Sequence, residues 1–121
     1  MGATPESPSP LDCEKLLEEC DDEQMFAYRC LHTFSRDVQL DMNGISAALD
    51  RGDVSQVARL AHRIKGASAS IRAEFIRRQA ARLEALSEKK ELASASECFF
   101  RLQAEFEHFK SFIANLPLFA D

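Results

Sequence analysis

Residues 53–72 of the chain read DVSQVARLAHRIKGASASIR. Apolar side chains recur in this stretch every three or four positions, which is the spacing of one face of an α-helix. The stripe consists of Val57, Leu60, Ile64, Ala67 and Ile71. Asp53 and Gln56 stand three positions apart just before the stripe, in the pattern of an N-terminal capping box. The stretch therefore predicts an amphipathic helix that begins after Asp53 and turns near residue 72.

A similar periodicity continues on both sides of this helix. Before it, a long helix is predicted from an Asp21-x-x-Gln24 capping box to Gly52, which can act as a C-cap. The stripe of the long helix is Leu31, Phe34, Val38, Met42, Ile45 and Leu49. After residue 72, a further helix turns Ile76, Ala80 and Leu83 inward and ends at the polar break formed by residues 87–90.

The last helix is predicted to begin near Ser94 and to stop at Pro117, because proline cannot continue a helix. Its stripe is Ala95, Phe99, Leu102, Phe106, Phe109, Ile113 and Leu116. At the front, a proline-rich flexible leader over residues 1–10 precedes a short helix over residues 11–20. We expect an all-α fold, an up-down antiparallel four-helix bundle with a short additional N-terminal helix, in one domain over residues 11–121.

The composition of the 121-residue chain excludes several classes of protein. Four glycines, four prolines and no tryptophan argue against a turn-rich β architecture. The four cysteines form no C-x-x-C pair, which argues against a zinc site or a disulfide scaffold. Neither a long apolar run nor a secretory signal is present. We therefore expect no membrane association and a cytoplasmic location, or a nuclear one if the cell is eukaryotic.

Charge is unevenly distributed along the chain, although the net value is only -5. Residues 1–23 contain eight acidic side chains and one lysine, whereas residues 59–82 contain seven basic side chains and one glutamate. The basic stretch is expected to attract an anionic partner. A nucleic acid is disfavoured as that partner, because the whole protein is acidic and no helix-turn-helix signature accompanies the arginines.

His62 lies about 160° around its helix from Ile64, the centre of the buried face, and is therefore predicted to face water. The residues around it on that face are small: Ala58, Gly66, Ala69 and Ala73. Solvent faces usually carry long charged side chains, and glycine inside a helix costs roughly 1 kcal/mol relative to alanine. This surface of small residues would let another molecule approach His62 closely, with Lys65 supplying positive charge. A solvated histidine without a function is the alternative.

Two other histidines are weaker candidates. Glu105-x-x-His108 matches half of a di-iron motif, but no second half accompanies it, so we expect no metal site in this chain. His32 is interpreted as a boundary residue of the long helix beside Leu31. The phenylalanines mostly follow helical spacing and are interpreted as core residues.

The stretch at residues 61–71, AHRIKGASASI, resembles the signature of histidine phosphotransfer domains: histidine, any residue, an aliphatic residue, lysine, glycine and then small residues. The resemblance implies that His62 is the phosphoacceptor, that Lys65 helps to hold the phosphoryl oxygens and that Gly66 lets the partner dock. The family also tends to place Gln or Glu on the following helix to orient the imidazole. Glu84 falls at the matching place, and a turn near residues 72–73 would set it level with His62. A surface carboxylate paired with Arg77 or a lysine is the alternative.

The chain departs from the family pattern at Arg72, where the family usually has a second glycine. A helix often ends in a left-handed residue, a conformation that favours glycine. If the helix continued, the Arg72 side chain would lie close to Lys65 in projection, within reach of the phosphate or an acidic partner. The expected partner-binding residues are Ala58, Arg59, Arg63, Gly66, Ala69 and Arg72.

The resemblance implies a carrier in a multistep phosphorelay. His62 would accept a phosphoryl group from the receiver domain of a hybrid sensor histidine kinase and pass it to the receiver domain of a response regulator. No cofactor is expected on this chain, since receiver domains bind Mg²⁺ themselves, and the absence of an ATP-binding motif argues against a kinase. We expect a monomer. The alternative is a helical adaptor that binds receiver domains through the same face without being phosphorylated.

Overall fold

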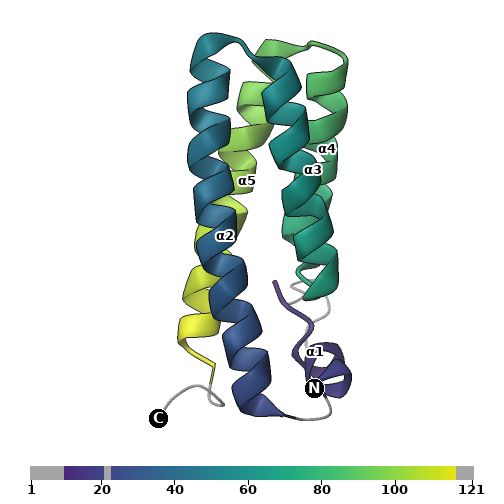
Figure 1. Ribbon diagram of the computed structural model, residues 1–121, viewed down its shortest axis with the longest axis vertical. Coiled ribbons are helices and arrows are strands. Elements are labelled where there is room, and N and C mark those ends of the chain that lie inside the picture. Colours follow the sequence, from purple (N-terminus) through teal and green to yellow (C-terminus); the bar gives the residue numbers. More distant parts are fainter. Residues whose placement is uncertain (1–9, 21–22, 117–121) are drawn as a thin grey trace, which may run out of the picture.

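The computed structural model describes residues 10–20 and 23–116, and the regular elements in these ranges are all helices. They are α1 (Cys13–Glu19), α2 (Gln24–Arg51), α3 (Val54–Ser70), α4 (Glu74–Glu88) and α5 (Leu92–Ala114). Figure 1 shows the four long helices side by side, running alternately up and down, with α1 at the end of the bundle where α3 meets α4. The predicted up-down bundle with a short additional helix is confirmed.

The core is built from the apolar stripes of the four long helices. The largest fully buried side chains include Leu31, Ile45, Ile64, Ile76, Leu83, Leu102, Phe106 and Phe109. Burying a side chain of this size stabilises the fold by about 1.5–3 kcal/mol relative to leaving it exposed. Edge-to-face packing of Phe34 on Phe109, with ring centroids 5.2 Å apart, joins α2 to α5. Burial of the stripes therefore fixes which face of each helix points outward.

The three links between the long helices close in the same way. Each contains one left-handed residue: Gly52 (φ 69°), Arg72 (φ 66°) and Lys90 (φ 61°). The next N–H then donates to the carbonyl five residues back, which is the longer hydrogen bond of a Schellman motif. These bonds are Asp53 to Ala48 at 2.8 Å, Ala73 to Ser68 at 2.9 Å and Glu91 to Leu86 at 3.1 Å. Arg72 thus adopts the left-handed conformation in which a helix often ends, and each short link returns the chain directly into an antiparallel helix.

The beginnings of α2 and α3 differ in how they are capped. The carboxylate of Asp53 accepts a hydrogen bond from the N–H of Gln56 at 3.1 Å, as the capping-box pattern predicts. Asp21, the cap predicted for α2, lies outside the described residues. In the structure Glu23 occupies the N-cap position of α2, and its side chain makes no capping hydrogen bond.

Several predicted boundaries need correction. α4 continues through Ser87, which is buried, and its hydroxyl is satisfied by donating to the Leu83 carbonyl at 2.8 Å. α5 begins at Leu92 rather than Ser94 and ends at Ala114, and Pro117 lies outside the described residues. Residues 1–9 of the predicted leader also lie outside them, whereas Pro10 is buried. The described residues thus begin one position before the predicted start of the domain.

Helix α1 is attached to the α3–α4 link. The N–H of Asp12 donates to the carbonyl of Arg72 at 3.3 Å, and the guanidinium of Arg72 forms an ion pair with Glu19. Leu11 and Leu16 are buried against the bundle. The short helix therefore covers the end of the core at the point where the chain carries arginine in the left-handed position.

Cys13, Cys20, Cys30 and Cys98 form no disulfide bond with one another. Burial raises the pKa of Cys13 and of Cys98, which keeps both thiols protonated at neutral pH. Among the described residues, no helix has the length and apolar character needed to cross a membrane.

Candidate functional site

The α3–α4 hairpin places His62 beside Glu84. The two residues are 22 positions apart, one on each side of the link at Arg72 and Ala73, and the antiparallel helices bring them level. Nδ1 of His62 lies 3.0 Å from Oε2 of Glu84, within hydrogen-bond distance. The predicted position of Glu84 beside the imidazole is therefore confirmed.

Glu84 also binds Lys65. The ammonium Nζ lies 2.8 Å from Oε1, so the two oxygens of one carboxylate hold two different side chains of α3. The Glu84 side chain is only 15% exposed, whereas that of His62 is 66% exposed. A largely buried acid thus holds an imidazole that faces solvent, as the helical projection predicted.

The protonation of this cluster follows from its hydrogen bonds. Burial alone would raise the pKa of Glu84, but hydrogen bonds from Lys65 and His62 outweigh burial and hold that pKa below its usual value. An ionised carboxylate can only accept, so Nδ1 of His62 must be the donor. In the neutral ring, Nε2 is then left with a free lone pair, and it is the nitrogen that can attack an electrophile.

Small residues surround His62 on the outer face of α3. Gly66 and Ala69 are exposed and Ala58 is half-buried. A Cβ added to Gly66 would meet no heavy atom within 4 Å, so packing within the chain does not require glycine there. Ala73 does not belong to this surface of small residues, because α3 ends at Ser70 and Ala73 is buried as the N-cap of α4.

The predicted partner-binding arginines have contacts within the chain. Nη2 of Arg63 lies 3.1 Å from Oδ1 of Asp41 on α2, and Nε of Arg59 donates to Gln56 at 3.0 Å. The predicted projection of Arg72 toward Lys65 is wrong, because α3 ends before it and its guanidinium pairs with Glu19. A role for Arg72 in partner binding stays a prediction.

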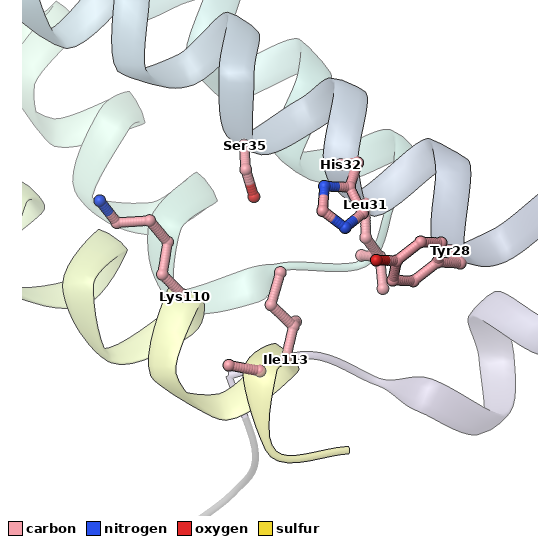
Figure 2. A pocket seen from close by; sticks show the side chains of 7 residues that line it. Tyr28, Leu31, His32, Ser35, Lys110 and Ile113 are labelled. Atoms are coloured by element: carbon pink, nitrogen blue, oxygen red, sulfur yellow. The ribbon is translucent and has the colours of Figure 1, made fainter. Parts of the chain in front are cut away.

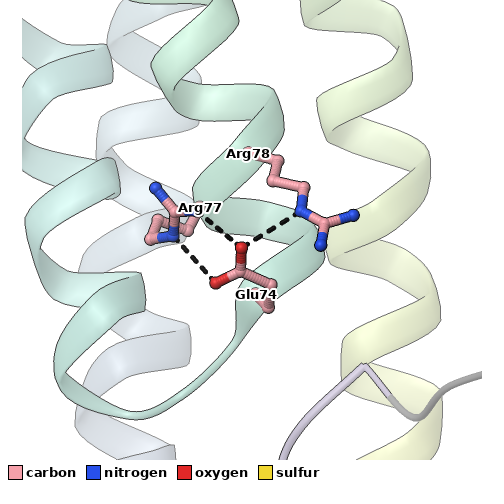
Figure 3. A network of polar contacts seen from close by, with 3 residues as sticks. All are labelled: Glu74, Arg77 and Arg78. Carbon is pink, nitrogen blue, oxygen red and sulfur yellow. Dashed lines mark hydrogen bonds and ion pairs between the residues drawn. The ribbon is translucent and has the colours of Figure 1, made fainter.

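Two further arginines share one carboxylate at the start of α4 (Figure 3). Nε of Arg77 donates to Oε1 of Glu74 at 2.8 Å, and Nε of Arg78 donates to Oε2 at 3.1 Å. The hydrogen bond from Arg77 is the main reason that the pKa of Glu74 falls to about 2. Glu84 is therefore not the partner of Arg77. Much of the positive charge counted in the sequence is offset by acids within the fold.

A family model for the Hpt domain matches residues 29–112 of this chain. The chain belongs to the Hpt domain family. A solved relative is histidine-containing phosphotransfer protein B from Pseudomonas aeruginosa PAO1, which is 25% identical, with a TM-score of 0.78 over 89% of this chain and 95% of that one. No curated protein matches the chain significantly. The predicted family and bundle fold are thus confirmed.

The α2 side of the Hpt domain presents residues that the sequence patterns did not single out. Leu40 on α2 is 64% exposed, and Asp41 beside it is buried. A groove of about 460 Å³ lies between α2 and α3, one to two turns along α3 from His62. It is lined by Phe26, Arg29, Cys30, Thr33, Phe34, Asp37, Ala67, Ser70 and Ile71. Leu40 lies outside the apolar stripe of α2, and a leucine at such a position was the signal in the sequence that could have pointed to this surface.

The remaining predicted candidates lie elsewhere on the Hpt domain. His32 packs edge-on against Tyr28, with ring centroids 4.3 Å apart, and lines a hollow of about 370 Å³ between α2 and α5. Figure 2 shows Ser35 and Lys110 on opposite sides of this hollow. His108 is exposed and Glu105 half-buried. Within residues 10–20 and 23–116, no group of three or more potential ligands is placed to hold a metal ion.

Proposed function

We propose that this Hpt domain carries a phosphoryl group in a multistep phosphorelay, with Nε2 of His62 as the phosphoacceptor atom. The observation that carries the proposal is the hydrogen bond between His62 Nδ1 and Glu84, since it selects the tautomer whose exposed Nε2 can attack. The signature lysine and glycine at residues 65 and 66 support the same assignment.

The proposed forward step is attack of Nε2 on the phosphorus of an aspartyl phosphate in a receiver domain. A P–N bond forms while the P–O bond to the aspartate breaks, and the electron pair of the P–O bond stays on the aspartate carboxylate. Nδ1 keeps its proton, so the phosphorylated ring is cationic and Glu84 offsets that charge. The second transfer reverses these bond changes toward the aspartate of another receiver domain.

Lys65 is proposed to stabilise the phosphoryl oxygens. Phosphoryl transfer depends mainly on positioning and on charge stabilisation, and an ammonium supplies a mobile point charge without forming a covalent bond. Glu84 holds Nζ of Lys65 at 2.8 Å on the same carboxylate that binds His62. Mg²⁺ would come from the receiver domain, which binds it beside its phosphorylatable aspartate.

The proposed partners are the receiver domains of a hybrid sensor histidine kinase and of a response regulator. We propose that they dock on the face formed by His62, Ala58, Gly66 and Ala69, and that the Hpt domain acts as a monomer in the cytoplasm. The chain contains no ATP-binding motif, so its proposed role is that of a carrier rather than of a kinase.

The test is incubation of the full chain with a receiver domain of a hybrid kinase that carries ³²P on its aspartate. We expect acid-labile, base-stable radioactivity on the wild-type chain and none on His62→Gln. The variant should keep the wild-type circular dichroism spectrum, because an exposed side chain contributes little to the core. Receiver binding without any phosphate transfer would instead support the adaptor, and equal labelling of His62→Gln would refute the assignment.

A further inference from the structure

A second acid–base pair lies on the other side of α3 from Lys65 and Glu84. Oδ1 of Asp41, from α2, is 3.1 Å from Nη2 of Arg63, the residue that follows His62. The Asp41 side chain is 10% exposed and that of Arg63 is 57% exposed. As in the first pair, a neighbouring helix supplies a largely buried acid that holds a cation of α3.

The burial of Asp41 follows from the close packing of α2 on α3. Gly44, one turn after Asp41, faces the Leu60 side chain so closely that an added Cβ would lie 2.8 Å from Cδ1. Burial raises the pKa of Asp41, Arg63 and Arg59 oppose that rise, and Asp37 adds to it. A buried carboxylate is costly, and an ion pair that contains one often adds no stability over apolar residues of similar volume. Stability alone therefore does not account for Asp41.

The direction of Arg63 distinguishes its role from that of Lys65. Glu84 holds both the imidazole and Lys65 on the α4 side of α3, whereas Asp41 holds the Arg63 guanidinium on the α2 side. The phosphoryl group would therefore contact Lys65. Arg63 is positioned to contact the surface of the receiver domain that delivers the phosphoryl group. A guanidinium is a planar fork of donors that matches a carboxylate in two parallel hydrogen bonds.

We propose that Asp41 is a positioning residue that fixes Arg63 on the α2 side of His62, where the guanidinium binds a carboxylate on the surface of the docking receiver domain. The inference rests on the proposed function, because it assigns a contact to the same docking event. Pre-ordering of the long arginine side chain by Asp41 lowers the entropy that is lost when the partner binds.

The test is a double-mutant cycle on phosphoryl uptake by the full chain, measured as single-turnover kinetics with the ³²P-labelled receiver domain as substrate. In these measurements kcat is the maximal rate constant of uptake, and KM is the receiver-domain concentration at which the rate is half of that maximum. Arg63→Gln should raise KM about tenfold with kcat nearly unchanged, as expected for a lost charged hydrogen bond that serves docking alone. Asp41→Asn should raise KM about threefold, because Arg63 stays but is no longer held. The KM of the double variant should equal that of Arg63→Gln alone. Arg101→Gln, which removes an exposed arginine of α5, is the charge-matched control and should leave KM unchanged.

The cycle separates positioning from a structural role. A structural Asp41 would raise KM by the same factor with and without Arg63, and that result would overturn the inference, as would an unchanged KM in Arg63→Gln. The double variant leaves no unpaired charge, so it guards against misfolding of Arg63→Gln, and thermal melts check all variants. A wild-type chain that takes no phosphate from the receiver domain would overturn the proposed function, and this inference with it.

Discussion

Nδ1 of His62 and Oε2 of Glu84 lie 3.0 Å apart, although the two residues are 22 positions apart in the sequence. The short link at Arg72 and Ala73 sets this register, because it returns α4 along α3 with the two side chains level. Orientation of the imidazole is thus a property of the hairpin. The site residues can be tested separately from the fold that positions them.

Glu84 should make the stability of the Hpt domain depend on pH. Its pKa is lower in the folded state than the ordinary value, so its contribution is complete above about pH 4.5 and is lost as the pH falls through the folded-state pKa. Relative to the wild type, Glu84→Gln should lose about 1 kcal/mol of unfolding free energy at pH 7 and less at pH 3. Urea denaturation at both pH values measures the difference, and a difference that grows toward pH 3 would contradict the ionised Glu84.

Lys65→Ala should slow phosphoryl transfer without preventing docking. The ammonium is expected to stabilise developing charge on the phosphoryl oxygens, so kcat for uptake should fall about tenfold or more while KM changes little. Single-turnover kinetics at saturating phosphorylated receiver domain isolate this step. Arg101→Gln again serves as the control for loss of one positive charge, and an unchanged transfer rate in Lys65→Ala would remove the lysine from the mechanism.

Gly66 should be required for docking of the receiver domain and not for folding of the Hpt domain. Because an added Cβ would meet nothing within 4 Å, Gly66→Ala should stabilise α3 by up to about 1 kcal/mol, the difference in helix propensity. Gly66→Gln should also keep the fold but raise KM for the phosphorylated receiver domain, because the long glutamine side chain would cover the surface of small residues beside His62. Thermal melts and uptake kinetics test both statements. A Gly66→Gln variant with wild-type KM would show that the partner does not approach there.

Arg72→Gly should have opposing effects on stability. Glycine relieves the left-handed backbone, but the variant loses the ion pair with Glu19 and gains freedom in the unfolded chain. We therefore expect little change in Tm in the wild-type background. When Glu19→Gln has already removed the ion pair, Arg72→Gly should raise Tm by about 2–4 °C. If Arg72→Gly raised Tm less in the Glu19→Gln background than in the wild type, these opposing contributions would be refuted.

The parts of the fold and site that were predictable depend on local spacing. Helical periodicity placed His62 on the outer face of α3, and the short link allowed the position of Glu84 to be counted from the turn. The left-handed Arg72 was predictable because a helix that stops and reverses commonly ends in that conformation. These features need only the geometry of one helix or one hairpin.

The features that sequence reasoning missed depend on packing between distant segments. Glu19 and Arg72 are 53 positions apart, and their ion pair forms only because α1 folds onto the α3–α4 link. Asp41 pairs with Arg63 because of how closely α2 packs on α3, which no periodicity within α2 reveals. Ala73 was misplaced because the helical projection was extended past Ser70, where α3 ends.

The role of Glu84 in selecting the attacking nitrogen is tested by the position of the phosphorus on the ring of His62. The chain, with its histidines labelled with ¹⁵N, would be charged by a phosphorylated receiver domain and examined by ³¹P and ¹⁵N NMR. Because Glu84 binds Nδ1, we expect one phosphohistidine signal whose phosphorus couples to Nε2 of His62. Phosphorus bound to Nδ1, or a phosphohistidine signal that persists in His62→Gln, would contradict it.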